Sequence, residues 1–262
     1  MIRTYLLLAW TWLRASAQYP GPLIVMTLGS FAVNALDVAA IWIIFEHTGS
    51  LGGFNRAEVM FLYGTAGLSF GLADMAFGNV DRLSRHIRAG TFDTMLIRPV
   101  SAFVQMATDR FGVHRFGRLA QAVAVLGIAL PRLDVAWSRA WMIPLMIVCG
   151  VVIFTSIFTI GGALQFLLTD APEVSNAFTY GGSTLTQYPL SVYRGDLVKG
   201  VTFIVPLAFV NWQPALFVLD RQDPFGLPYW LRFAAPLAAL GLAVAAALAW
   251  RTGIRRYRST GS

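Results

Sequence analysis

The residues of this chain that could do chemistry are few and scattered. None of its three histidines, His47, His86 and His114, belongs to an HExxH or HxE…PCxxC pattern. Ser183 follows two glycines, but no histidine is expected at the same depth in the fold to act as its base. No GxxxxGK[ST] loop is present, so nucleotide phosphates cannot be bound in the P-loop manner. We therefore expect no catalytic residue, no metal site and no cofactor in this chain.

Two aspartates lie inside apolar segments, where a carboxylate costs about 2.5–3.5 kcal/mol in a lipid environment. Asp37 follows Asn34 by one helical turn, and the two could share a face. This face is interpreted either as the lining of a polar pathway or as a hydrogen-bonding anchor between helices. Asp74 lies close to the end of its segment, where interfacial water alone could solvate it.

The composition places these residues in a membrane protein. Of the 262 residues, 56% are hydrophobic and only 13% are charged, against about a quarter charged in soluble domains. The net charge of +7 does not indicate nucleic-acid binding, because the basic residues adjoin apolar runs and suit membrane orientation and anionic lipids. The single Cys149 excludes a disulfide framework. The fold class expected is an all-α membrane protein of one domain.

Hydropathy predicts six transmembrane helices. They cover residues 23–45, 59–78, 111–131, 140–168, 200–219 and 233–250. The third is too short to cross unless Arg115 and Arg118 extend toward the interface. Gly67 and Gly71 in the second would let another helix approach closely. Residues 171–199 are expected to form an amphipathic or irregular inner segment.

The distribution of charge predicts the topology. With both termini in the cytoplasm, three quarters of the 20 Lys and Arg residues lie on the cytoplasmic side, Arg194 and Lys199 included. Residues 1–20 contain an Ala-Ser-Ala run that matches a signal-peptidase site. The alternative is an interfacial helix with Trp10 and Trp12 in the headgroup zone, and the charge count favours it.

A basic stretch, residues 81–118, separates the second and third predicted spans. It carries seven arginines: Arg82, Arg85, Arg88, Arg98, Arg110, Arg115 and Arg118. Leu83 and Ile87 lie at helical spacing, Gly90 suits a helix C-terminus, and Pro99 ends a second short helix at Arg98. The pattern predicts a compact folded element, which is either a solvated loop that fixes topology or a docking surface.

The fifth predicted span contains two prolines, Pro206 and Pro214, and is expected to bend or break near its outer end. Asn211, Trp212 and Gln213 lie between them. A gate or substrate-facing wall and a simple packing kink are both compatible with this pattern.

Three features together resemble the ABC-2 family of exporter permease subunits: the stretch GTFDTMLIRPVS at 90–101, the broken fifth helix and the basic tail at 255–262. The resemblance covers essentially the whole chain. It implies six transmembrane helices with both termini inside, an N-terminal connecting helix at 1–20 and a coupling helix at 81–100. It also implies two ATP-binding cassette subunits, which bind ATP and Mg, and a second permease subunit, identical or paralogous.

Carried onto this chain, the resemblance places coupling to the ATP-binding subunit in nine residues. They are Arg82, Arg85, Arg88, Gly90, Phe92, Asp93, Leu96, Arg98 and Pro99. Within this set Phe92 and Leu96 are expected as apolar plugs, and Asp93 and Arg98 as polar partners. The candidate substrate path is Asn34, Asp37, Asn211, Trp212 and Gln213.

The function expected is that of a non-catalytic permease subunit. It would export an amphipathic, drug-like or lipid-linked substrate across the cytoplasmic membrane by alternating access. An ion-coupled carrier or channel would need charges in several spans, and this chain offers only Asp37 and Asp74. A membrane scaffold without transport remains an alternative.

Overall fold

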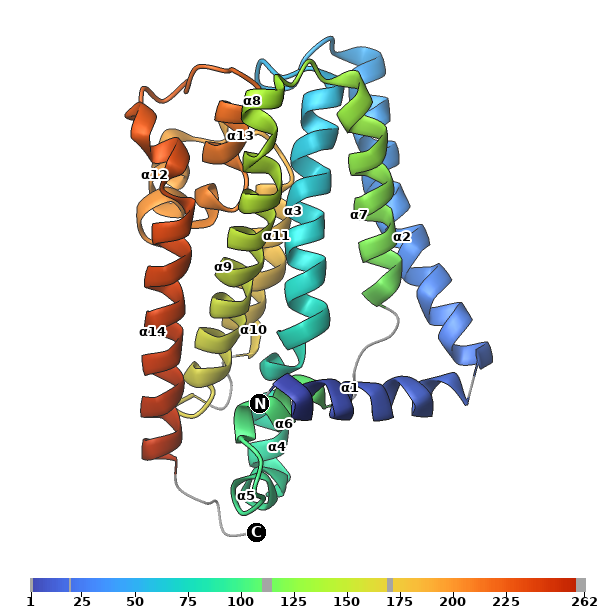
Figure 1. Ribbon diagram of the computed structural model, residues 1–262, viewed down its shortest axis with the longest axis vertical. Coiled ribbons are helices and arrows are strands. Elements are labelled where there is room, and N and C mark those ends of the chain that lie inside the picture. The colour runs from blue at the N-terminus through green and yellow to red at the C-terminus, as the bar shows by residue number, and fades with distance from the viewer. Residues whose placement is uncertain (1, 19, 110–114, 169–171, 258–262) are drawn as a thin grey trace.

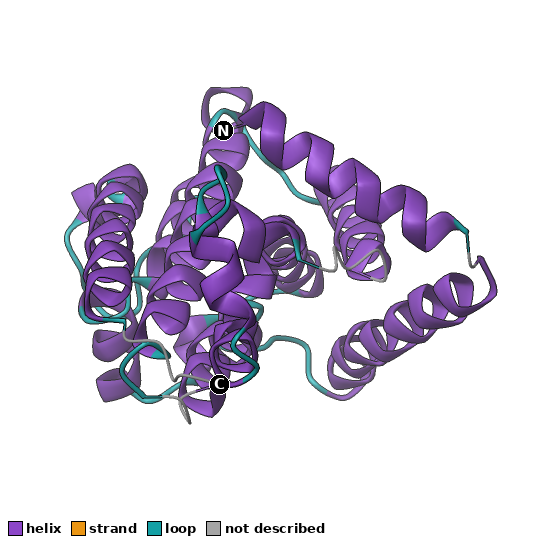
Figure 2. Cartoon of the chain, turned by 90° about the horizontal axis from the view of Figure 1, so that it is seen from below, coloured by secondary structure: helices purple, strands orange, loops and turns teal. Residues whose placement is uncertain are grey.

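The computed structural model describes residues 2–18, 20–109, 115–168 and 172–257, and about 80% of the chain is helical, with no strand in those ranges. Four long helices stand side by side (Figure 1): α2 (Pro20–His47), α3 (Arg56–Phe77), α9 (Met142–Leu164) and α14 (Ala235–Arg256). The shorter α7 (Phe116–Ala129) lies beside α2 and α3, while α1 (Ile2–Ala17) lies across the helix ends (Figures 1 and 2).

Short elements complete the fold. At the end where α1 lies are η1 (Gly78–Arg82), α4 (Leu83–Arg88), α5 (Thr91–Leu96) and α6 (Ala102–Thr108). We call this the basic end. The remaining elements are η3 (Leu130–Arg132), α8 (Trp137–Ala140), α10 (Pro172–Asn176), η4 (Ala177–Gly181), α11 (Gly182–Thr186), η5 (Leu190–Val192), α12 (Gly195–Phe203), η6 (Leu207–Phe209), α13 (Trp212–Val218) and η7 (Tyr229–Phe233).

The prediction of six spans is met only in part. Four segments are long and apolar enough to cross a membrane: Pro20–His47, Arg56–Arg88, Trp137–Leu164 and Ala235–Arg256. The predicted third span corresponds to α7, whose 14 residues are too few, and residues 111–114 of that prediction lie outside the described residues.

The centre of the fold is α3, and its glycines set the packing. A Cβ atom on Gly64 would lie 2.9 Å from the Cβ of Leu126, and one on Gly67 would lie 3.2 Å from the Cβ of Ala122. Both neighbours belong to α7, so small residues on α3 bring the two helices into close contact. The predicted close approach at Gly67 and Gly71 is confirmed.

The predicted fifth crossing at 200–219 is bent, so its helices form either a broken span or a re-entrant loop. The helical pieces Gly195–Phe203 and Leu207–Val218 are bent by 79° relative to each other. The predicted break at Pro206 is confirmed, and it is stabilised by Asn211, whose Nδ2 donates to the carbonyl oxygens of Leu62 (3.1 Å) and Thr186 (2.7 Å).

The segment expected to be irregular and inner, residues 171–199, is largely helical where described. From α10 near the basic end, η4 and α11 rise between α3 and α9 (Figure 1). At its far end the Ser191 hydroxyl donates to the carbonyl of Gly52, in the loop between α2 and α3, at 2.7 Å. Arg194 and Lys199 therefore lie at the end opposite the basic end, contrary to the predicted topology.

Candidate coupling site at the basic end

The basic stretch folds as a compact unit, as its sequence indicates. The first short helix is α4, which buries Leu83 and Ile87 and exposes Arg85 and Arg88. Gly90 then adopts φ = +66°, a left-handed conformation that favours glycine, and starts α5. The second helix ends at Leu96 rather than at Arg98.

An aromatic cluster anchors this unit to the long helices. The Phe92 ring is fully buried, with its centroid 5.3 Å from that of Phe166 and 5.1 Å from that of Tyr257. The Phe166 ring lies 5.4 Å from Trp250. The expectation that Phe92 is an exposed plug is therefore corrected, because its side chain joins α5 to the ends of α9 and α14.

Asp93 also faces its own chain. Burial, together with hydrogen bonding to Asp93 and the negative charge of that carboxylate, raises the pKa of Tyr257 just after α14. Asp93 is half-buried beside the C-terminal end of the last helix. Its role in the free chain is thus to hold α5 against α14, in addition to any contact with a partner.

The helix α1 is fixed to the same unit. The Tyr5 hydroxyl donates to the carbonyl of Ala76 at 2.8 Å, and the Tyr5 ring lies 6.0 Å from that of Phe77. The Phe77 ring stacks on Phe103 of α6 at 5.8 Å. An interfacial helix is what the sequence predicts at 1–20, and its contacts make it part of the rigid basic end.

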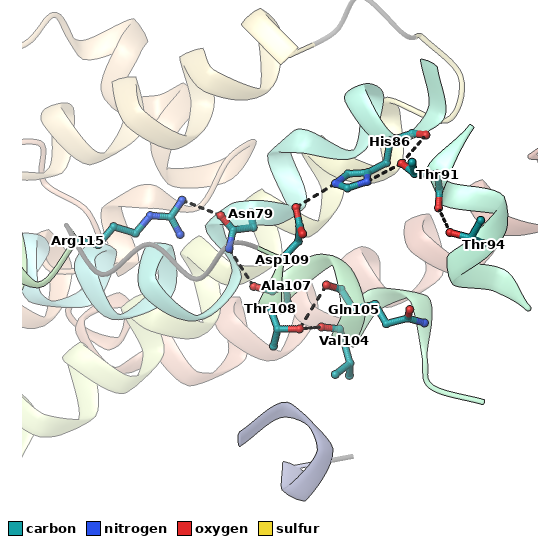
Figure 3. A network of polar contacts seen from close by, with 10 residues as sticks. All are labelled: Asn79, His86, Thr91, Thr94, Val104, Gln105, Ala107, Thr108, Asp109 and Arg115. Carbon is teal, nitrogen blue, oxygen red and sulfur yellow. Dashed lines mark hydrogen bonds and ion pairs between the residues drawn. The ribbon is translucent and has the colours of Figure 1, made fainter. Parts of the chain in front are cut away.

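A network of polar contacts holds α4, α5 and α6 together (Figure 3). His86 contacts Thr91 Oγ1 at 2.9 Å and Asp109 Oδ2 at 3.1 Å. The amide of Gln105 donates to the carbonyls of Met95 (2.9 Å) and Val100 (2.8 Å). These two hydrogen bonds connect α6 to residues on both sides of the turn at 97–99.

This turn is the most exposed apolar part of the basic end. Leu96 is 41% exposed and Ile97 83% exposed, and Arg98 and Pro99 are exposed as well. We call residues 96–99 the tip surface. Arg85 and Arg88 are exposed on α4, while Arg82 is half-buried. Sequence reasoning omitted Ile97, although an isoleucine before Arg-Pro, at the end of a short helix, is the signal that would have revealed it.

Above the tip surface a buried ion pair joins α3 to α7. Arg115 Nε lies 3.3 Å from Asp74 Oδ2, and both side chains are less than a tenth exposed. Arg115 also donates to the carbonyl of Asp74 at 2.6 Å and to Asn79 Oδ1 at 3.2 Å (Figure 3). The expectations that interfacial water solvates Asp74 and that Arg115 extends to the interface are both wrong. The Arg118 guanidinium lies 5.0 Å from the centroid of the Phe70 ring and is likewise directed inward.

The junction η1 is bonded to three further elements. Gln165, after α9, donates to the carbonyl of Asp81 at 3.0 Å and accepts from the amide of Ser84 at 2.7 Å. Ser175 of α10 donates to Asp81 Oδ1 at 2.9 Å, and Asn79 donates to the carbonyl of Ala107 of α6 at 3.2 Å. Hydrogen bonds therefore connect η1 to α6, α9 and α10, and the Arg115–Asn79 bond connects it to the start of α7.

The five residues of the candidate substrate path are not brought together. Asn34 is buried, with its amide donating to the Ser30 carbonyl at 2.6 Å, whereas Asp37 is exposed on α2. Trp212 packs on Phe54 with 5.2 Å between ring centroids. Gln213 is fully buried.

The partner of Gln213 is Asp223, which accepts a hydrogen bond from its Nε2 at 2.9 Å. Asn211, Trp212 and Gln213 are thus buried and pack within the bent helix pair and its surroundings. Among the residues that the structure describes, no group of three His, Cys, Asp or Glu side chains is placed to hold a metal ion.

These features define a class: a multi-pass helical membrane protein whose transmembrane helices are rigidly joined to a folded basic unit with an exposed apolar tip. The chain belongs to the ABC-2 family of transporter proteins, whose family model matches residues 31–261. Proteins of this family are generally non-catalytic membrane permease components and usually work with an ATP-binding subunit. No curated protein and no solved structure matches the chain.

Proposed function

We propose that this chain is the permease subunit of an ATP-driven exporter in the cytoplasmic membrane, with the basic end in the cytoplasm. The tip surface binds a separate ATP-binding subunit, and two such subunits serve a pair of permeases, identical or paralogous. The observation that carries the proposal is the exposed Ile97 beside Arg98, held rigidly by the aromatic cluster around Phe92. An apolar anchor flanked by arginine is typical of the centre of a protein interface.

The route of coupling follows from the contacts of η1. Closure of the ATP-binding subunits moves the tip surfaces of the two permeases, and η1 transfers this movement to α7, α9 and α10 through Asn79, Asp81 and Gln165. A transport cycle needs two states with different contacts. We propose that the Asp81–Ser175 hydrogen bond is one contact that differs between them, since it joins the junction to the ascending segment α10–α11.

We further propose that this chain crosses the membrane six times, with α7 lengthened by η3 over 116–132 as the third crossing and with α10, η4 and α11 as the fifth. The bent pair of α12 and α13 then lies at the outer end and does not cross. Charge supports this arrangement, because Arg255 and Arg256 in the last turn of α14 and the arginines of α4 lie at one end of the molecule. The apolar composition of the helices favours an amphipathic, drug-like or lipid-linked cargo over a free ion.

Cysteine labelling tests the orientation. In a Cys149→Ser background, Ile97→Cys is expected to resist a membrane-impermeant maleimide in intact cells and to react after permeabilisation. Trp137→Cys, at an equally exposed site on the opposite end, is expected to react in intact cells. Labelling of the cysteine at 97 from outside would refute the proposed topology and, with it, coupling to a cytoplasmic ATPase.

Co-purification tests the partner. The tagged chain, extracted from its native membrane in mild detergent, is expected to carry a Mg-dependent ATP-hydrolysing subunit in equimolar amount. ATP hydrolysis by the reconstituted complex is expected to be stimulated by its cargo, as in a coupled cycle. Transport by the purified chain alone would contradict the proposal and favour a carrier or channel.

A further inference from the structure

A groove descends between α9 and α14 toward the basic end, apart from the coupling site. Its upper part is a cavity of about 210 Å³ whose lining includes Ile157, Leu164, Val174, Phe178, Ile204 and Leu242. Its lower part, of about 250 Å³, lies between the last turns of α9 and α14. Leu164 lines both parts, so the two cavities adjoin.

The polarity of the groove changes along its length. Among the described residues lining the upper part, the one polar side chain is Ser175, whose hydroxyl donates to Asp81 and is therefore already satisfied. The lower part ends at Thr252 and Arg256, and Arg256 is exposed. The groove is thus apolar within the membrane and cationic at the membrane surface, as an anionic amphiphile requires.

The length of the groove matches one leaflet. Leu242 and Arg256 lie fourteen residues apart on α14, which corresponds to about 21 Å at 1.5 Å per residue. Half of a bilayer with its headgroups measures about 20–22 Å. Ile204 and Val205, after α12, also line the upper cavity.

We propose that this groove binds one anionic phospholipid from the leaflet on the basic side, with an acyl chain in the upper cavity and the phosphate at Arg256. An apolar cavity of about 150 Å³ is already enough to bind benzene, and the upper cavity is larger. Basic pockets between transmembrane helices on the cytoplasmic side bind anionic headgroups. In this proposal the lipid is a resident ligand and not the cargo of the proposed exporter.

Photolabelling of the purified chain tests this site. The chain is reconstituted in phosphatidylcholine vesicles that contain traces of phosphatidylglycerol with a diazirine in its acyl chain. Adducts are expected to be more abundant in peptides covering 157–164 and 242–253 than in the peptide covering the lipid-facing residues 24–36 of α2. A phosphatidylcholine probe with the same acyl chain is expected to label the groove about fivefold less. This factor corresponds to the affinity that one arginine near an anionic lipid contributes, about 1 kcal/mol.

Two pairs of variants separate a built site from general lipid contact. Arg256→Gln is expected to lower phosphatidylglycerol labelling of the groove about fivefold, whereas Arg255→Gln, at an exposed neighbour that does not line it, is expected to leave the labelling nearly unchanged. Leu164→Trp is expected to abolish labelling of the upper cavity, and Leu240→Trp, on an exposed face outside the groove, to preserve it.

Several outcomes would overturn the inference. One is that the probe labels α2 and the groove equally. A second is that Arg256→Gln and Arg255→Gln lose the same amount of groove labelling. A third is that cross-linking shows a second copy of the chain covering the groove in place of lipid. Should Leu164→Trp fail to fold, Val174→Trp fills the same cavity from a half-exposed position. None of these readouts depends on ATP or transport, so the site can fail while the proposed function stands.

Discussion

Replacing Ile97 with aspartate is expected to release the ATP-binding subunit from this permease while the permease stays folded. The Ile97 side chain is 83% exposed in the free chain, so its loss removes no internal packing. In the complex the side chain at position 97 would be removed from water beside Arg98. The partner's surface is expected to be shaped for an apolar side chain there, so an aspartate would bury a charge without a suitable partner. Loss of an interfacial hot spot costs about 2 kcal/mol or more, which corresponds to at least about 30-fold weaker binding.

The measurement is the affinity of the purified ATP-binding subunit for the permease in vesicles, together with ATP-dependent transport. Trp137→Asp provides the matched control, since Trp137 is 93% exposed but lies at the opposite end. Phe92→Ala provides the second control. It is expected to lower the free energy of unfolding by about 3–5 kcal/mol, because Phe92 is fully buried. If Ile97→Asp binds the ATP-binding subunit as tightly as the unchanged chain does, the tip surface is not part of the interface.

The contrast between the buried Phe92 and the exposed Ile97 shows how much of this unit could be predicted from the sequence. A short basic helix, a glycine turn and a second helix follow from local spacing, and the structure contains all three. The burial of Phe92 depends on Phe166 and Tyr257, which come from distant parts of the chain. Local pattern therefore predicted the unit and named its exposed Leu96, but it did not separate the buried Phe92 from it and omitted Ile97.

Hydropathy identified α2, α3, α9 and α14 because each contains a long, predominantly apolar window. It failed at 172–186, where hydroxyl residues make the segment look irregular. In the structure these hydroxyls bond to carbonyls of their own helix, as when Thr179 donates to Ser175 (3.0 Å) and Thr186 to Ser183 (2.9 Å). In the apolar residues 200–219, hydropathy does not register the bend of 79° between the two helical pieces.

The buried pair of Asp74 and Arg115 was not predictable from either residue alone, and it is expected to be a major determinant of stability. Asp74→Asn and Arg115→Gln should each lower the free energy of unfolding by about 3–5 kcal/mol, because each removes one member of a buried ion pair. The double variant is expected to lose much less than the sum of the two, since it removes both charges. Arg118→Gln, which removes a cation–π contact with Phe70, should cost about 0.5–2 kcal/mol.

Reversible unfolding in mixed micelles measures this cycle, and transport measured per ATP hydrolysed separates stability from coupling. Arg115 joins the start of α7 to the end of α3, where η1 begins, so its loss disconnects α7 from the tip surface. Arg115→Gln is therefore expected to bind the ATP-binding subunit normally, because the tip surface is intact, and to hydrolyse ATP with reduced transport. Additive losses in the double variant would show that the two charges act independently, and full transport by Arg115→Gln would remove α7 from the coupling route.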